Sequence, residues 1–165
     1  MILRRTAIGM IGFACLACCI HAFAEPDGTA VPFPTEYRKW VHVKTTLVGP
    51  QHASFARNGG IHHFYANEKA MEGYRTGKFP DGSVLIDDLL EVKESAGVTS
   101  EGSRRRVAVM VKDSQRYRET GGWGFEIFAG DNQTDGTLTA EAKAACLACH
   151  GKQKDRDYVF SQFRK

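Results

Sequence analysis

Apolar and polar residues alternate along several stretches of this chain, and the alternation predicts β-strands. These stretches are rich in valine, isoleucine, threonine and aromatic residues and are bounded by glycine, proline and asparagine, as strands are. The stretch 83–92 alternates only weakly, which predicts a strand buried on both faces. The pattern predicts strands at 41–48, 61–66, 83–92, 106–112 and 123–128.

Two further stretches carry helix-capping residues. Asn67 is placed to cap a helix over 68–75, which Gly77 would end, and Thr139 is placed to cap a helix over 140–148. Both are short, so they predict helices that pack on a sheet rather than a helical bundle.

The remaining segments predict turns and loops. A short turn is expected over 36–40 and another from Asp113, while residues 93–103 are polar, carry two glycines and predict a surface loop. The fold class predicted is α+β: a mostly antiparallel β-sheet domain with a few short helices.

Residues 1–24 have the organisation of a cleavable signal peptide. Arg4 and Arg5 precede an apolar run over 7–20, and an Ala-x-Ala site ends at Ala24. The apolar run is too short for a membrane span. We therefore expect export, most simply to a bacterial periplasm. A lipoprotein anchored at Cys18 is the alternative, but the preceding leucine is one position too close to that cysteine.

Cleavage would leave two parts. Residues 25–34 hold three prolines and a glycine and predict a flexible leader, and residues 35–165 predict a single domain. Without Arg4 and Arg5, 20 basic residues face 19 acidic ones, so the formal net charge falls from +3 to about +1. This balance gives no indication of nucleic acid or an anionic membrane as a partner.

The main chemical motif is CLACH at 146–150. Two thiols three positions apart can each form a thioether with a haem vinyl group, and the following histidine can bind the iron. Cys146 and Cys149 are thus the predicted anchors of one covalent haem c, and His150 is its predicted proximal metal ligand. The copy CLAC at 15–18 is followed by Cys19 instead of histidine.

Alternatives for the motif are weaker. After cleavage only two of five cysteines remain, so no disulfide framework is available. A structural zinc site would need a partner cluster, because the three motif residues lie too close together for one tetrahedral site.

Several segments resemble the cytochrome P-460 family, in order and over nearly all of 35–163. They are YRKWV (37–41), FPDGSV (79–84), VKDSQR (111–116), GWGF (122–125), the haem motif and DYVF (157–160). The resemblance implies a mostly antiparallel domain, usually a homodimer, carrying one c-type haem whose distal side is open or water-bound. It also implies one of two roles: oxidation of hydroxylamine, or binding of small gases such as nitric oxide, as in cytochrome c′-β.

The resemblance implies that a cross-linking lysine separates these roles. In hydroxylamine-oxidising members it lies five residues beyond the turn glycine and is bonded to the haem. Here that position, five beyond Gly82, is Asp87. An acid cannot form this bond, so the sequence argues against hydroxylamine oxidation. Lys78 precedes the turn and would need a different approach to the ring.

The position of one carboxylate instead favours hydroxylamine oxidation. Active members place one five residues before the first haem cysteine, and here it is Glu141. In an apolar distal pocket its pKa would be raised and suited to proton transfer. The alternative is that Glu141 complements the dipole of its helix.

The other distal candidates are His62 and Phe79. His62 and His63 must face opposite sides of a strand. By position His62 matches a basic residue of the distal pocket in some members, with a half-buried sheet residue as the alternative. Phe79 is expected in the core or the haem wall.

Other candidates favour structural roles. Met71 and Met110 are possible sixth ligands but more consistent with core packing. The basic run 104–106 predicts a solvated edge, with a redox partner or a haem propionate as alternatives.

The hypothesis favoured by the sequence is a haem c protein with an open iron. It would bind a small gaseous or nitrogenous ligand such as nitric oxide and exchange electrons with an unidentified periplasmic redox partner. Hydroxylamine oxidation and simple electron transfer are the alternatives.

Overall fold

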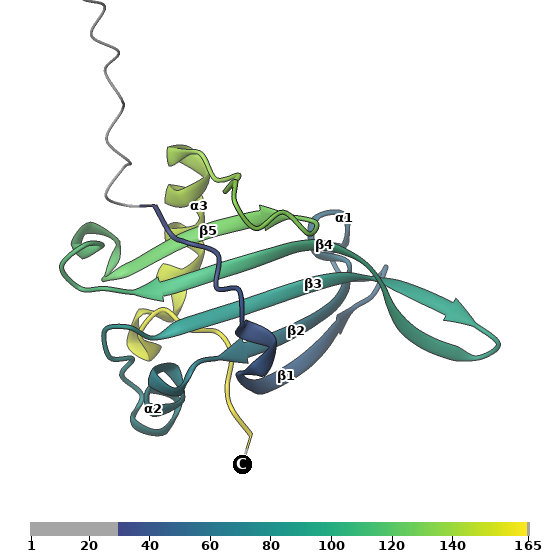
Figure 1. The fold of residues 1–165 in the computed structure, drawn as a ribbon, viewed down its shortest axis with the longest axis horizontal. Coiled ribbons are helices and arrows are strands. Elements are labelled where there is room, and N and C mark those ends of the chain that lie inside the picture. Colours follow the sequence, from purple (N-terminus) through teal and green to yellow (C-terminus); the bar gives the residue numbers. More distant parts are fainter. Residues whose placement is uncertain (1–29, 165) are drawn as a thin grey trace, which may run out of the picture.

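A five-stranded antiparallel sheet dominates the computed structural model, which describes residues 30–164 (Figure 1). Each strand pairs with the next along the chain, in the order β1-β2-β3-β4-β5. The strands are β1 (Val41–Val48), β2 (Gly60–Ala66), β3 (Val84–Ser95), β4 (Val98–Lys112) and β5 (Trp123–Ala129). The predicted α+β class is confirmed. The predicted signal peptide lies outside the described residues.

Short helices lie before the first strand, in several connections between strands and after the last strand. They are the 3-10 helices η1 (Tyr37–Lys39), η2 (Arg118–Thr120) and η3 (Gly151–Arg156), and the α-helices α1 (Phe55–Asn58), α2 (Glu68–Thr76) and α3 (Ala140–His150). Asn67 Oδ1 accepts a hydrogen bond from the Ala70 amide at 2.9 Å, and Thr139 Oγ1 accepts one from Ala142 at 3.3 Å. Both predicted caps therefore satisfy amides of a first helical turn. Nothing helical between residues 30 and 164 is long and apolar enough to cross a membrane.

The segment 93–103 is not the predicted surface loop. It forms the ends of β3 and β4, which pair from Lys93 with Ser100 to Ser95 with Val98 and project beyond the sheet (Figure 1). The turn residues Ala96 and Gly97 both have positive φ, 49° and 78°, which matches the twist of a two-residue hairpin. The prediction was wrong because the hairpin has no buried face to produce alternation, and backbone pairing alone defines it.

The described end of the predicted flexible leader is also packed. Val31 is 5% exposed, and the Phe33 ring meets that of Phe128 edge-on with centroids 5.1 Å apart. Val31 is therefore buried and Phe33 partly buried, and both pack on the apolar side chains of the sheet.

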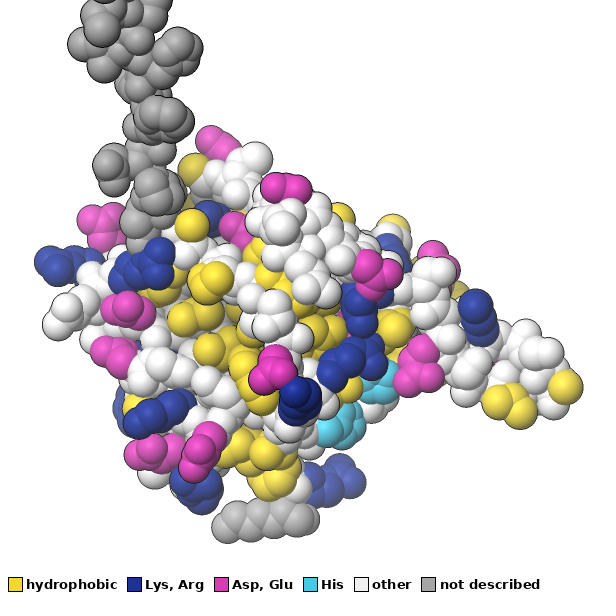
Figure 2. Space-filling view, in the orientation of Figure 1, with side chains coloured by type: hydrophobic (Ala, Val, Ile, Leu, Met, Phe, Trp, Pro, Cys, Tyr) yellow, Lys and Arg dark blue, Asp and Glu magenta, His cyan; other side chains and the backbone are white. Residues whose placement is uncertain are grey.

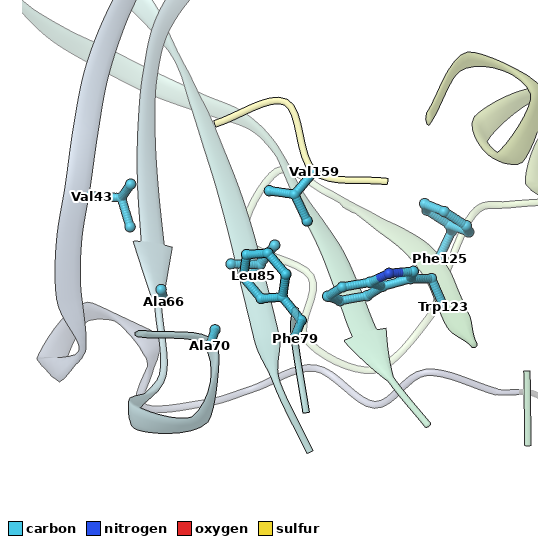
Figure 3. Packing of buried hydrophobic residues seen from close by; sticks show 8 residues of the cluster. All are labelled: Val43, Ala66, Ala70, Phe79, Leu85, Trp123, Phe125 and Val159. Atoms are coloured by element: carbon cyan, nitrogen blue, oxygen red, sulfur yellow. The ribbon is translucent and has the colours of Figure 1, made fainter. Parts of the chain in front are cut away.

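The two faces of the sheet are covered by opposite ends of the chain (Figure 1). We name them the N-terminal face, covered by residues 31–40, and the C-terminal face, covered by α3 and residues 157–161. The buried apolar residues of the N-terminal face are Val31, Tyr37, Ile86, Val107, Val109, Tyr117 and Phe128. Those of the C-terminal face are Val43, Ala66, Ala70, Phe79, Leu85, Trp123, Phe125 and Val159 (Figure 3).

Adjacent acidic residues of β3 serve opposite faces. Asp88 is completely buried on the N-terminal side, where Tyr37 Oη, Arg38 Nη2 and Arg104 Nε donate to it at 2.7, 2.6 and 2.8 Å. Burial and the hydrogen bond to Asp88 raise the pKa of Tyr37 to about 12. Asp87 lines a cavity on the C-terminal face. At the surface, acidic and basic side chains are interspersed on the face shown in Figure 2.

Candidate functional site

Helix α3 carries the CLACH motif at its last turns and presents it to the C-terminal face. Cys146 is half-buried and packs against the apolar cluster, whereas Cys149 is exposed, and neither forms a disulfide. Burial raises the pKa of the Cys146 thiol, and the nearby Cys149 and Glu126 add to this effect. Residues 30–164 contain no group of three or more His, Cys, Asp or Glu side chains arranged to hold a metal ion.

The His150 imidazole is fixed in one tautomer by the backbone. Its Nδ1 lies 2.8 Å from the carbonyl oxygen of Tyr158. A carbonyl only accepts, so Nδ1 carries the proton and Nε2 keeps its lone pair. Burial lowers the pKa of His150, which favours the neutral ring. The rings of Phe125 and Phe160 lie beside it, with centroids at 5.2 and 5.1 Å.

A cavity of about 260 Å³ adjoins His150. It lies between strands β2–β4 and the C-terminal segment, and its lining is mostly apolar. The lining residues are Phe64, Leu85, Ile86, Asp87, Ala108, Met110, His150, Val159, Phe160 and Ser161. Two thiols and a neutral imidazole with a free Nε2, next to an apolar cavity, are the donor set that a covalently attached haem requires. The residues present therefore fit this group.

A hydrogen-bonded pair borders the cavity. His62, which is 5% exposed, places Nδ1 2.8 Å from Asp87 Oδ1 and Nε2 2.7 Å from the carbonyl oxygen of Asn58. Both ring nitrogens face oxygen atoms that can accept a hydrogen bond, but a neutral imidazole carries only one N–H. Both hydrogen bonds therefore form only if the ring is protonated or if Asp87 carries a proton. Burial lowers the pKa of His62, but the hydrogen bond and charge of Asp87 outweigh this and raise it overall.

Arg106 completes this group from β4. It donates to the carbonyl oxygen of Arg57 at 3.0 Å and to Asn58 Oδ1 at 2.9 Å, while its buried Nε has no partner within the described residues. Burial lowers the pKa of Arg106, partly offset by Asp87. The sequence prediction of a solvated edge missed this arrangement. Only the strand register could have indicated it, because Leu89 of β3 is the partner of both His62 on β2 and Arg106 on β4.

The structure does not bring all the predicted distal residues together. Asp87 lines the cavity and His62 holds Asp87, but Phe79 packs in the core, with its ring 5.2 Å from that of Tyr74 and 5.7 Å from that of Trp123. Phe79 is thus a core residue, the first of the two expectations for it.

Glu141 lies outside this cavity. It is fully exposed in the first turn of α3, where hydrogen bonds from its own amide and from Thr139 hold its pKa below the ordinary value. A carboxylate in the first turn of a helix can complement the helix dipole, and the distal-base role of Glu141 stays a prediction. The carboxylate found at the cavity is Asp87.

A family model described as cytochrome P460 matches residues 34–161, which is most of the chain. No curated protein matches the chain.

Proposed function

The chain belongs to the cytochrome P460 family, and from this premise we propose that it is an exported cytochrome with one covalent haem c and an open iron site. In this proposal it binds nitric oxide or a similar small ligand and undergoes a one-electron redox change. Membership of the family makes it a haem-binding cytochrome. The mode of attachment, the ligand and the export are the parts we propose.

Three residues would hold the haem. Cys146 and Cys149 supply the thioether sulfurs, and His150 supplies Nε2 to the iron. When bound, the haem supplies an iron that changes between two oxidation states and takes a small ligand. The protein's part is to fix the His150 tautomer through Tyr158 and to keep the neighbouring cavity mostly apolar.

The observation that carries the proposal is the cavity beside His150. The residues of its sheet-side wall are apolar except for Asp87. The family's cross-linking position thus carries an acid at the cavity wall. This supports ligand binding over hydroxylamine oxidation, because a carboxylate cannot supply the amine for the cross-link.

One observation favours a second candidate, the electron-transfer cytochrome. Met110 lines the same cavity as His150, so its thioether is available as a sixth ligand. The Met110→Leu variant separates the two functions, since leucine preserves the packing but cannot bind iron.

The test is the optical spectrum of the purified mature protein, reduced with dithionite and then exposed to nitric oxide. An ordinary high-spin ferrous haem c band that shifts with nitric oxide, equally in wild type and Met110→Leu, is the expected result. A low-spin spectrum that becomes high-spin in Met110→Leu would establish the electron carrier. A broad ferrous band displaced far to the red would indicate a cross-linked haem and hydroxylamine chemistry. His150→Ala is the control, and it should lose the native ferrous spectrum.

The proposal extends to location and assembly. Export through residues 1–24 would place the protein in the periplasm, where it would exchange electrons with a redox partner and form a homodimer. N-terminal sequencing of the periplasmic fraction should begin at Glu25, and sedimentation should give twice the mass of one chain.

A further inference from the structure

The backbone after η3 turns through two residues of unusual conformation. Asp157 and Tyr158 have φ of 50° and 66°, in the left-handed region that residues other than glycine seldom adopt. Such a conformation persists only where surrounding contacts determine it. This turn provides the carbonyl of Tyr158 that binds His150 Nδ1 at 2.8 Å.

Asp157 is held on both sides of its carboxylate. Oδ1 accepts from Lys112 Nζ at 2.7 Å, and Oδ2 accepts from the Phe79 amide at 2.8 Å. Its backbone carbonyl accepts from Trp123 Nε1 at 3.0 Å. The side chains of Lys112 and Asp157 are each 11% exposed.

The neighbouring residues restrict the turn further. Lys112 Nζ also donates to the Gly121 carbonyl at 3.0 Å and lies 5.0 Å from the centre of the Trp123 ring. The Tyr158 ring lies so close to Gly121 that an added Cβ there would be 2.4 Å from its Cζ. Lys112 thus joins β4, the Gly121 turn and the Asp157 turn at one point.

Stability alone is a weak reason for this ion pair. Removing two charges from water is costly, and apolar substitutes for a buried pair are often as stable. A buried pair can instead specify where a segment lies, and here the segment is the one that holds His150.

We propose that the Lys112–Asp157 ion pair positions the proximal histidine: it holds the Tyr158 carbonyl against His150 Nδ1 and so sets how strongly His150 donates electrons to the haem iron. Lys112 and Asp157 are positioning residues, since neither lines the cavity. The inference rests on the proposed ligation of iron by His150. A hydrogen bond accepted from Nδ1–H makes the imidazole a stronger donor, so weakening it should raise the reduction potential.

The experiment compares Asp157→Asn and Lys112→Met in the purified holoprotein. Resonance Raman spectroscopy of the reduced protein measures the iron–histidine stretch, and redox titration measures the potential. Both variants should lower the stretching frequency and raise the potential. An effect of charge alone would move the potential in opposite directions, upward on losing Asp157 and downward on losing Lys112.

Asp88→Asn is the matched control. It disrupts a buried ion pair on the opposite face of the sheet, so it should lower stability with no change in the iron–histidine stretch, and its lost charge alone can move the potential only upward. Opposite shifts of potential, or lost stability with an unchanged stretch in the two test variants, would overturn the inference.

The wild-type spectrum tests the proposed function separately. A reduced wild-type protein without an iron–histidine stretch would contradict the open iron. The inference would then be decided by whether Asp157→Asn and Lys112→Met shift the reduction potential in the same direction. If wild type holds no haem through His150, both the proposed function and the inference fail.

Discussion

The buried carboxylate of Asp88 gives a quantitative test of what stabilises this fold. Asp88 accepts three hydrogen bonds, from Tyr37, Arg38 and Arg104, with its side chain completely buried. In Asp88→Asn the shape is preserved, but the charge is lost and an amide N–H₂ group is brought among donors. The side chain of Arg104, which is 18% exposed, would then lose its buried counter-ion.

The size of the effect follows from the exposure of each partner. Breaking a buried ion pair by removing one charge costs about 3–5 kcal/mol. The side chain of Arg38 is 50% exposed, so its share is at most about 1 kcal/mol. We therefore take the lower end, about 3 kcal/mol. For a domain of this size 1 kcal/mol corresponds to about 4 °C, so the expected fall in Tm is about 12 °C.

The assay is thermal unfolding of the holoprotein followed by circular dichroism, with Asp87→Asn as the matched control on the same strand. The Asp87 side chain is 23% exposed and makes one hydrogen bond, to His62, so its loss should cost about 1 kcal/mol. Asp87→Asn should instead alter ligand binding, because Asp87 lines the cavity. Equal losses of Tm in the two variants, or a greater loss for Asp87→Asn, would refute this division between the faces.

Three further predictions concern other parts of the structure. The pKa of His62 is raised above 6.5 in the folded protein, so the stability that protonated His62 contributes is complete below pH 6.5 and is lost as the pH rises through the raised pKa. The stability difference between wild type and His62→Gln, measured by urea unfolding, should therefore be larger in acid than in alkali. A difference that grew with pH would contradict the pairing of His62 with Asp87. In Gly73→Ala the new Cβ would lie 2.3 Å from the Phe79 ring, so we expect a loss of about 1–3 kcal/mol by the same assay, and an unchanged midpoint would show that the ring moves freely. Glu141 is fully exposed, so Glu141→Gln should leave the nitric oxide-bound spectrum unchanged, and a changed spectrum would support its role as a distal residue.

The strands could be predicted because each has a buried face that produces alternation. In β2 the predicted division into two faces is confirmed: Tyr65 packs on the N-terminal face, while Phe64 and Ala66 pack on the C-terminal face. The hairpin over 93–103 could not be predicted in this way, since it has no buried face. Local composition indicates a strand only where tertiary packing has selected that composition.

The candidate site also has one part that the sequence predicts and another part that it does not. The CLACH motif is contiguous in sequence, so its spacing alone predicts the three residues that would hold a haem. The pairing of His62 with Asp87 spans 25 positions, and that of Lys112 with Asp157 spans 45. Such contacts depend on strand register and on the path of the C-terminal segment, which no local pattern specifies. Glu141 was suggested only by its place relative to the motif, and in the structure it lies exposed in the first turn of α3.

The alternation of a β-strand explains how one short stretch serves both stability and function. Successive side chains of β3 point to opposite faces, so Asp87 lies at the cavity while Asp88 anchors the segment that covers the other side. A substitution at position 87 alters the wall of the cavity without disturbing the buried anchor at position 88, provided that the register is kept. Asp88 helps to fix that register, because it joins β3 to Arg104 of β4 and to residues 37 and 38 beside β1. The acid at position 87, where the resemblance implies a lysine in hydroxylamine-oxidising members, is thus a change that this fold can accommodate at little cost in stability.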